Sequence, residues 1–145
     1  MNAPAQFLTE SEIEWLKKHH SAVLVTIRRD GSPQTSNVAF GFDGTEAHVS
    51  VTADRAKTRN LQRDPRGVLH VLGDHFFQYA SLAVDAVLGP LSVEPGDQAG
   101  RDLLALNEFV GGKPHPDPDE FFAAMVADRR LLLRLVPRSG HFWGV

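Results

Sequence analysis

The fold of this chain follows from residues 21–53, "SAVLVTIRRDGSPQTSNVAFGFDGTEAHVSVTA". The stretch is rich in Val, Ile, Thr and Phe, which favour strands over helices. Two Asp-Gly pairs interrupt it, Asp30-Gly31 and Asp43-Gly44, and this dipeptide is typical of tight hairpin turns. The pattern predicts an antiparallel meander of three consecutive strands.

Short helices are predicted outside this stretch. Residues 7–19 begin with a capping box, in which Thr9 is the N-cap and Glu12 follows three residues later. A second helix is expected from Ala56, with Asp54 as its N-cap and a stop at Pro65. Two further helices are predicted at 98–110 and 117–129.

The remaining strands are predicted at 67–73, 76–95 and 129–145, with bends near Gly89-Pro90 and Pro137. Most strands are consecutive, and neither of the Gly-rich phosphate loops of parallel nucleotide-binding folds occurs. The chain is therefore expected to be mainly β, a small antiparallel barrel with peripheral helices, and to form one domain over residues 1–145.

The composition is typical of a globular protein and does not indicate a membrane protein. The 145 residues are 42% hydrophobic and 23% charged, as in ordinary globular domains, and no apolar run is long enough to span a bilayer. The chain has no cysteine, and its first residues lack the layout of a signal peptide. We expect a cytoplasmic protein with no membrane partner and, because the net charge is −3, no nucleic-acid partner.

One segment is basic, although the net charge of the chain is negative. Residues 54–66, "DRAKTRNLQRDPR", carry five basic and two acidic residues, a local charge of +3. Strand alternation places Ser50 and Thr52 on one face of the preceding strand, which leads directly into the start of a helix. Hydroxyls, free amides and the cations Arg55 and Lys57 at one place suit a phosphate group.

Asn60 shares a helical face with Lys57 and is expected to follow it toward the same ligand. The alternative is a solvated basic face, because Arg55, Arg59 and Arg63 recur every four residues.

Residues 23–44, "VLVTIRRDGSPQTSNVAFGFDG", and 48–71, "HVSVTADRAKTRNLQRDPRGVLHV", together resemble the flavin-binding split β-barrel family of pyridoxamine phosphate oxidase-like proteins. Within that family, "RAKTRNL" followed by "RDPR" is most similar to the actinobacterial subgroup of reductases that use the deazaflavin coenzyme F420. The tail "MVADRRLLLRLVP" agrees with the same subgroup. The resemblance covers residues 20–144.

The resemblance implies a six-stranded split barrel that works as a homodimer with two cofactor sites at the subunit interface. It places the phosphate contacts at Arg55 and Lys57, with Ser50, Thr52 and Asn60 beside them. The strand under the flavin ring matches residues 34–38, and the candidate contacts there are Gln34, Thr35, Ser36, Asn37 and Val38.

The resemblance further implies a contact across the dimer at Gln78 and Tyr79, and a cofactor contact at Trp143 in "HFWG". Ser36 and Asn37 could also be ordinary polar residues of a strand, and the two aromatic residues could belong to the core or to a subunit contact. True pyridoxamine phosphate oxidases continue past this tryptophan with an "R-L-H" segment, whereas the sequence ends at Val145. Oxidation of vitamin B6 is therefore not expected.

The resemblance implies an oxidoreductase that transfers a hydride between coenzyme F420 and a small unsaturated or quinone-like substrate. FMN is the alternative cofactor, in an oxidase or flavin reductase, and a non-catalytic cofactor carrier remains a further alternative. The sequence has more basic residues than one phosphate group requires, and this surplus favours the polyanionic deazaflavin. The surplus residues are Arg59, Arg63, Arg129 and Arg130.

Because such a cofactor ring carries the hydride, the absence of a catalytic triad is expected; the catalytic residues, including the proton donor, stay unassigned. The only adjacent histidines are His19 and His20, which point apart on a helix, so no metal site is predicted. His48 is a weak candidate for a cofactor contact, since it shares a strand face with Ser50 and Thr52.

Overall fold

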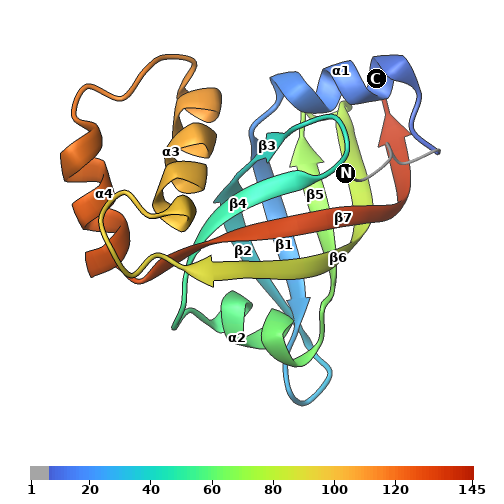
Figure 1. The fold of residues 1–145 in the computed structure, drawn as a ribbon. Helices are drawn as coiled ribbons and strands as arrows, with labels where there is room; N and C mark the ends of the chain where they lie inside the picture. The colour runs from blue at the N-terminus through green and yellow to red at the C-terminus, as the bar shows by residue number, and fades with distance from the viewer. Residues whose placement is uncertain (1–6) are drawn as a thin grey trace.

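An antiparallel sheet that curls around a central core forms most of the molecule (Figure 1). The structure is a computed structural model and describes residues 7–145. Its elements are α1 (Glu10–Lys18), β1 (Ser21–Ile27), β2 (Pro33–Ala39), β3 (Gly41–Phe42), β4 (Ala47–Thr52), α2 (Ala56–Arg63), β5 (Arg66–Leu72), β6 (Tyr79–Leu91), α3 (Gln98–Gly111), α4 (Pro118–Ala127) and β7 (Arg130–Trp143).

The strands follow the order β2-β1-β5-β6-β7-β4-β3, and every neighbouring pair is antiparallel. The predicted mainly β fold is confirmed. The sheet of the described residues has seven strands rather than six, because the two residues of β3 pair with β4.

The predicted meander is wrong after its first hairpin. The turn at Asp30-Gly31 joins β1 to β2 as expected, but β4 pairs with β7 and not with β2. Three successive residues, Phe40, Gly41 and Phe42, are all buried, so the alternation of a strand breaks there and the chain bends. The Asp43-Gly44 turn therefore closes a separate hairpin of β3 and β4.

The core lies inside the curved sheet. Burial alternates along the central strands, and five of the inward side chains are at most 1% exposed: Leu24, Val49, Leu69, Leu82 and Leu133. Each fully buried side chain of this size stabilises the fold by roughly 1.5–3 kcal/mol. This packing fixes the barrel wall on which the outward residues of β4 are displayed.

The first two helices cover opposite ends of the barrel (Figure 1). In α1 the predicted capping box is present, with Thr9 and Glu12 each bonded to the other's backbone. The expected N-cap of α2 is wrong: Arg55, and not Asp54, occupies that position, and no side chain caps the helix. The first turn of α2 therefore keeps free backbone N–H groups, and Leu61 anchors the helix in the core.

The α3–α4 hairpin lies between β6 and β7 in sequence and stands beside the barrel (Figure 1). A small cluster of Leu103, Phe121 and Met125 holds its two helices together. The β6–β7 pair has register shifts next to Gly89-Pro90 and Pro137, where the bends were predicted. None of the helices in residues 7–145 is both long and apolar enough to cross a bilayer.

Candidate functional site

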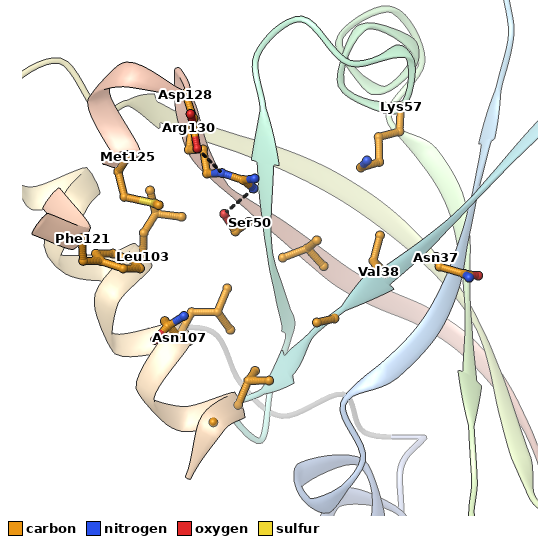
Figure 2. A pocket seen from close by; sticks show the side chains of 15 residues that line it. Asn37, Val38, Ser50, Lys57, Leu103, Asn107, Phe121, Met125, Asp128 and Arg130 are labelled. Carbon is orange, nitrogen blue, oxygen red and sulfur yellow. Dashed lines mark hydrogen bonds and ion pairs between the residues drawn. The ribbon is translucent and has the colours of Figure 1, made fainter. Parts of the chain in front are cut away.

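A cleft of about 640 Å³ separates the barrel from the α3–α4 hairpin (Figure 2). This volume is typical of small-molecule sites. The barrel supplies one wall and the hairpin the other, so the cleft brings together segments that are far apart in sequence. Its lining residues are Asn37, Val38, Ala39, Val49, Ser50, Lys57, Leu103, Leu106, Asn107, Val110, Gly111, Phe121, Met125, Asp128 and Arg130.

Positive charge gathers at the end of this cleft nearest α2. The Lys57 side chain points into the cleft from α2, and Arg130 enters from the start of β7 (Figure 2). Burial lowers the pKa of the Lys57 ammonium below its usual value, and the nearby charges of Arg55 and Arg130 lower it further. Within residues 7–145, no carboxylate lies at ion-pair distance from the Lys57 amine. This end of the cleft is therefore suited to an anion.

Hydroxyl groups on β4 lie beside these cations, as the strand alternation predicts. Arg130 Nη1 donates to Ser50 Oγ at 3.2 Å, and Ser50 lines the cleft. Thr52 is the register partner of Arg130 but does not line the cleft. Its Oγ1 is buried and has no hydrogen-bond partner among the described residues.

Arg55 and Asn60 lie differently from the expectation. Arg55 is exposed at the start of α2 and does not line the cleft, although its charge reaches Lys57. Asn60 is 7% exposed and points into the barrel wall. Its Nδ2 donates to Thr26 Oγ1 at 3.0 Å, and its Oδ1 accepts from Arg63 Nη2 at 3.0 Å. The structure gives Asn60 a role in attaching α2 to β1 and does not bring it to the cleft.

The five candidate residues on β2 differ in whether they border the cleft. Val38 and the exposed Asn37 border the cleft, but Figure 2 shows the Asn37 side chain pointing away from Ser50 and Lys57. Gln34 donates to Ser36 Oγ at 2.8 Å and accepts from the Thr26 hydroxyl at 2.9 Å. Gln34 and Ser36 are therefore used within the strand pair and do not line the cleft, and neither does Thr35.

Gln78, Tyr79 and Trp143 lie together, but in another hollow. That hollow has a volume of about 720 Å³ and shares no lining residue with the cleft. Gln78 binds the backbone of Asp74 and Gly144, and Tyr79 packs against the ring of His70. Within one chain, the predicted residues that line a space therefore fall into two separate groups, one at the cleft and one at this hollow.

The α3–α4 wall of the cleft was not foreseen as part of the site. Leu103, Phe121 and Met125 make this wall apolar, and Asn107 is its one neutral polar side chain. The helix at 98–110 was predicted, but nothing in the local sequence indicated what it would face. His48, a weak candidate for the site, lines a third cavity instead of the cleft.

The comparison with protein families identifies one match. Residues 8–143 match the family described as Pyridoxamine 5'-phosphate oxidase. This match spans almost the whole of the described chain and agrees with the resemblance carried by the sequence around Lys57.

Three solved structures show the same fold. A structure titled F420 reductase is 24% identical, with a TM-score of 0.69 over 92% of this chain and 98% of that one. A conserved hypothetical protein from Mycobacterium tuberculosis is 23% identical, with a TM-score of 0.74 over 98% and 89% of the chains. A putative pyridoxamine 5'-phosphate oxidase from Listeria innocua is 16% identical, with a TM-score of 0.65 over 92% and 95%. At these identities the likeness concerns the fold alone.

Proposed function

Because the chain belongs to the pyridoxamine 5'-phosphate oxidase family, we propose that it is an oxidoreductase whose cleft binds the deazaflavin coenzyme F420. The proposed substrate is a small, flat, unsaturated or quinone-like molecule. When bound, the coenzyme supplies hydride transfer, and the chain's own residues bind, orient and exclude water.

The surroundings of the Lys57 ammonium are the main support for this proposal. The ammonium is partly desolvated, lies near two other cations and has no carboxylate partner in residues 7–145. A protein does not gain stability from such an arrangement by itself, because like charges repel and burial disfavours the charged form. A phosphate bound at Lys57 and Ser50 would remove the repulsion and provide charge-assisted hydrogen bonds.

The other features of the cleft fit a flavin-type ligand. The hydroxyl of Ser50 lines the cleft beside Arg130 and can donate to a bound anion. The wall of Leu103, Phe121 and Met125 offers an apolar surface to the remainder of the ligand. One end of the cleft can thus hold an anionic stalk while the other accommodates an apolar body.

The choice of the deazaflavin over FMN depends on cations beyond the first phosphate. Arg130 lines the cleft, where its Nε lies 3.8 Å from Asp128 Oδ2, whereas the exposed Arg129 before it does not line the cleft. Arg63 no longer counts as surplus, because it donates to Ile27 O and Asn60 Oδ1. FMN remains the second candidate, since a single phosphate also satisfies Lys57.

We further propose that two copies of the chain form a homodimer that completes each site. The hollow that contains Gln78, Tyr79 and Trp143 is bordered by exposed aromatic rings, with Phe76 88% and Trp143 56% exposed. Exposed aromatic surface of this kind marks interaction sites. A partner that covers it would bring the second group of predicted residues next to the cleft of the other subunit.

Titration of the purified protein with coenzyme F420 and, separately, with FMN tests the assignment. We expect saturable quenching of the deazaflavin fluorescence, which Lys57→Glu abolishes because it reverses the charge facing the phosphate. Lys18→Glu is the matched control: it makes the same substitution at an exposed position of α1, at the opposite end of the barrel from α2 (Figure 1), and leaves binding within a few-fold.

Equal binding by wild type and Lys57→Glu would contradict the site. A preference for FMN would favour the alternative cofactor. The cofactor that binds more tightly is then screened for turnover with quinones and activated alkenes; binding without turnover would support a carrier.

A further inference from the structure

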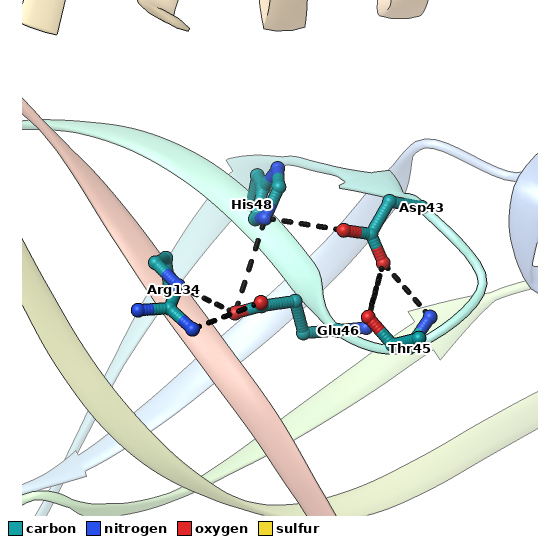
Figure 3. A network of polar contacts seen from close by, with 5 residues as sticks. All are labelled: Asp43, Thr45, Glu46, His48 and Arg134. Carbon is teal, nitrogen blue, oxygen red and sulfur yellow. Dashed lines mark hydrogen bonds and ion pairs between the residues drawn. The ribbon is translucent and has the colours of Figure 1, made fainter. Parts of the chain in front are cut away.

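Three potential metal ligands converge on the β3–β4 hairpin, outside the cleft (Figure 3). Asp43 lies in the turn, Glu46 immediately precedes β4, and His48 lies on β4. His48 Nε2 is 3.6 Å from Asp43 Oδ2 and 3.9 Å from Glu46 Oε2. One ligand atom from each residue lies within 4.8 Å of the others. The set therefore combines an imidazole nitrogen with two carboxylates.

The two separations from the His48 nitrogen are close to those of ligands around a shared ion. Distances of 3.6 and 3.9 Å exceed those of good hydrogen bonds. Bonds of about 2.0–2.2 Å to a tetrahedral zinc ion place neighbouring ligand atoms about 3.4 Å apart. The gap between the imidazole and the two carboxylates is thus close to the size that a divalent ion fills.

The β3–β4 turn holds Asp43 in place, and Arg134 of β7 holds Glu46, before any ion binds. Asp43 Oδ1 accepts from Thr45 N at 2.8 Å, from Thr45 Oγ1 at 2.9 Å and from Glu46 N at 2.8 Å, which leaves Oδ2 facing His48. Glu46 is 6% exposed, and Arg134 donates to both of its oxygens at 2.8 and 3.0 Å. Hydrogen bonds therefore position both carboxylates independently of an ion.

The three ligands also face a cavity, which is a separate observation from their convergence. The cavity has a volume of about 550 Å³, and Asp102 of α3 adds a third carboxylate to its lining. With His48 neutral, Asp43, Glu46 and Asp102 outweigh the single positive charge of Arg134, so the net charge facing the cavity is −2. Leu106 also lines the cleft, so α3 contributes to the walls of both spaces.

Arg134 affects how tightly such a site can bind a cation. Its guanidinium orients Glu46, as hydrogen-bonded outer groups orient metal-binding carboxylates in known sites. The same positive charge repels a cation, which limits affinity. A site of this kind would bind an ion reversibly and would not be a tightly closed structural centre.

We propose that Asp43, Glu46 and His48 bind one zinc-like divalent ion per chain, with an open coordination position toward the cavity. One nitrogen and two oxygen ligands suit Zn²⁺, with Co²⁺ as its spectroscopic substitute. Three protein ligands and an open position are the arrangement of zinc sites that bind a further small ligand.

The test uses full-length protein without a histidine tag, treated with chelator and then titrated with Zn²⁺ by calorimetry and with Co²⁺ by visible absorption. We expect one ion per chain and the absorption bands of four- or five-coordinate Co²⁺. Asp43→Asn keeps the turn acceptor but removes the charged ligand oxygen, and His48→Gln removes the nitrogen. Each variant is expected to weaken binding by about tenfold or more.

His115→Gln is the control, because this histidine lies away from the hairpin, in the loop before α4. It should bind as the wild type does. Circular dichroism shows whether each variant is folded. Equal affinity of wild type, Asp43→Asn and His48→Gln, or no Co²⁺ bands in the wild type, would overturn the proposal and leave the cluster as an ion-pair network that fixes β4 to β7.

Discussion

At the scale of single residues, the account depends on the protonation of Lys57. Its pKa is lowered by burial and by the charges of Arg55 and Arg130, so the ammonium of the free protein is neutralised at a lower pH than that of an ordinary lysine. An anionic ligand binds the charged form. Affinity should therefore be lost as pH rises through this lowered pKa, and the bound ligand should in turn hold the proton more firmly.

We expect the affinity for coenzyme F420 to be steady near neutral pH and to fall by about tenfold or more at alkaline pH, where one charge-assisted interaction disappears. Lys57→Arg is the informative variant, because a guanidinium stays charged throughout the range. Its affinity should remain steady to higher pH than that of the wild type. Superimposable pH profiles for the two proteins would show that Lys57 does not provide the charge.

Residue positions were predictable only where local geometry determined them. The alternation of β4 placed Ser50 correctly, because the register of a strand with one buried face is strongly fixed. Helical spacing alone misplaced Asn60. Its amide finds partners in Thr26 of β1 and in Arg63, and a contact with a strand 34 residues away leaves no trace in the local pattern.

At the scale of elements, the position of the α3–α4 hairpin determines the shape of the cleft, and Asp97 holds the start of that hairpin. One of its carboxylate oxygens accepts from Gly100 N and Ser92 Oγ, and the other accepts from Val93 N and Glu94 N. The hydrogen bond from Val93, followed by those from Gly100 and Glu94, holds the pKa of Asp97 well below its usual range.

We predict that Asp97→Asn lowers the melting temperature by a few degrees at neutral pH, because an amide NH₂ replaces one of these acceptors. A carboxyl group whose pKa is lowered by folding stabilises the protein above its ordinary pKa, and this contribution is lost as pH falls toward the folded-state value. The difference between wild type and variant should thus shrink in acid. The exposed Asp119→Asn in the first turn of α4 is the control. A constant difference across pH would contradict this role.

Elements were predictable from local signals, whereas their pairing was not. Both helices of the hairpin and the bends at Gly89-Pro90 and Pro137 follow from sequence. The pairing of β4 with β7 joins residues about 80 positions apart, such as Ser50 and Leu132, and only the buried bend at Phe40 to Phe42 separates it from the meander. The wall that α3 and α4 contribute to the cleft could therefore not be predicted from the sequence.

At the scale of the whole molecule, charge and apolar surface are distributed unevenly. Residues 54–66 carry +3 on a chain of net charge −3, and a local positive field of this kind favours the approach of an anionic ligand to the cleft. Three exposed aromatic rings, those of Phe76, Phe77 and Trp143, lie in the hollow that also contains Tyr79. A homodimer in which this hollow faces the cleft of the partner would account for both groups of predicted residues with one site.

A crystal structure of the protein with coenzyme F420 is the most direct test of the central claim. We predict phosphate oxygens within hydrogen-bond distance of Lys57 Nζ and Ser50 Oγ, with the ring bordered by β2 and by the partner subunit of a dimer. A coenzyme bound elsewhere, with Lys57 in contact with solvent alone, would contradict the account.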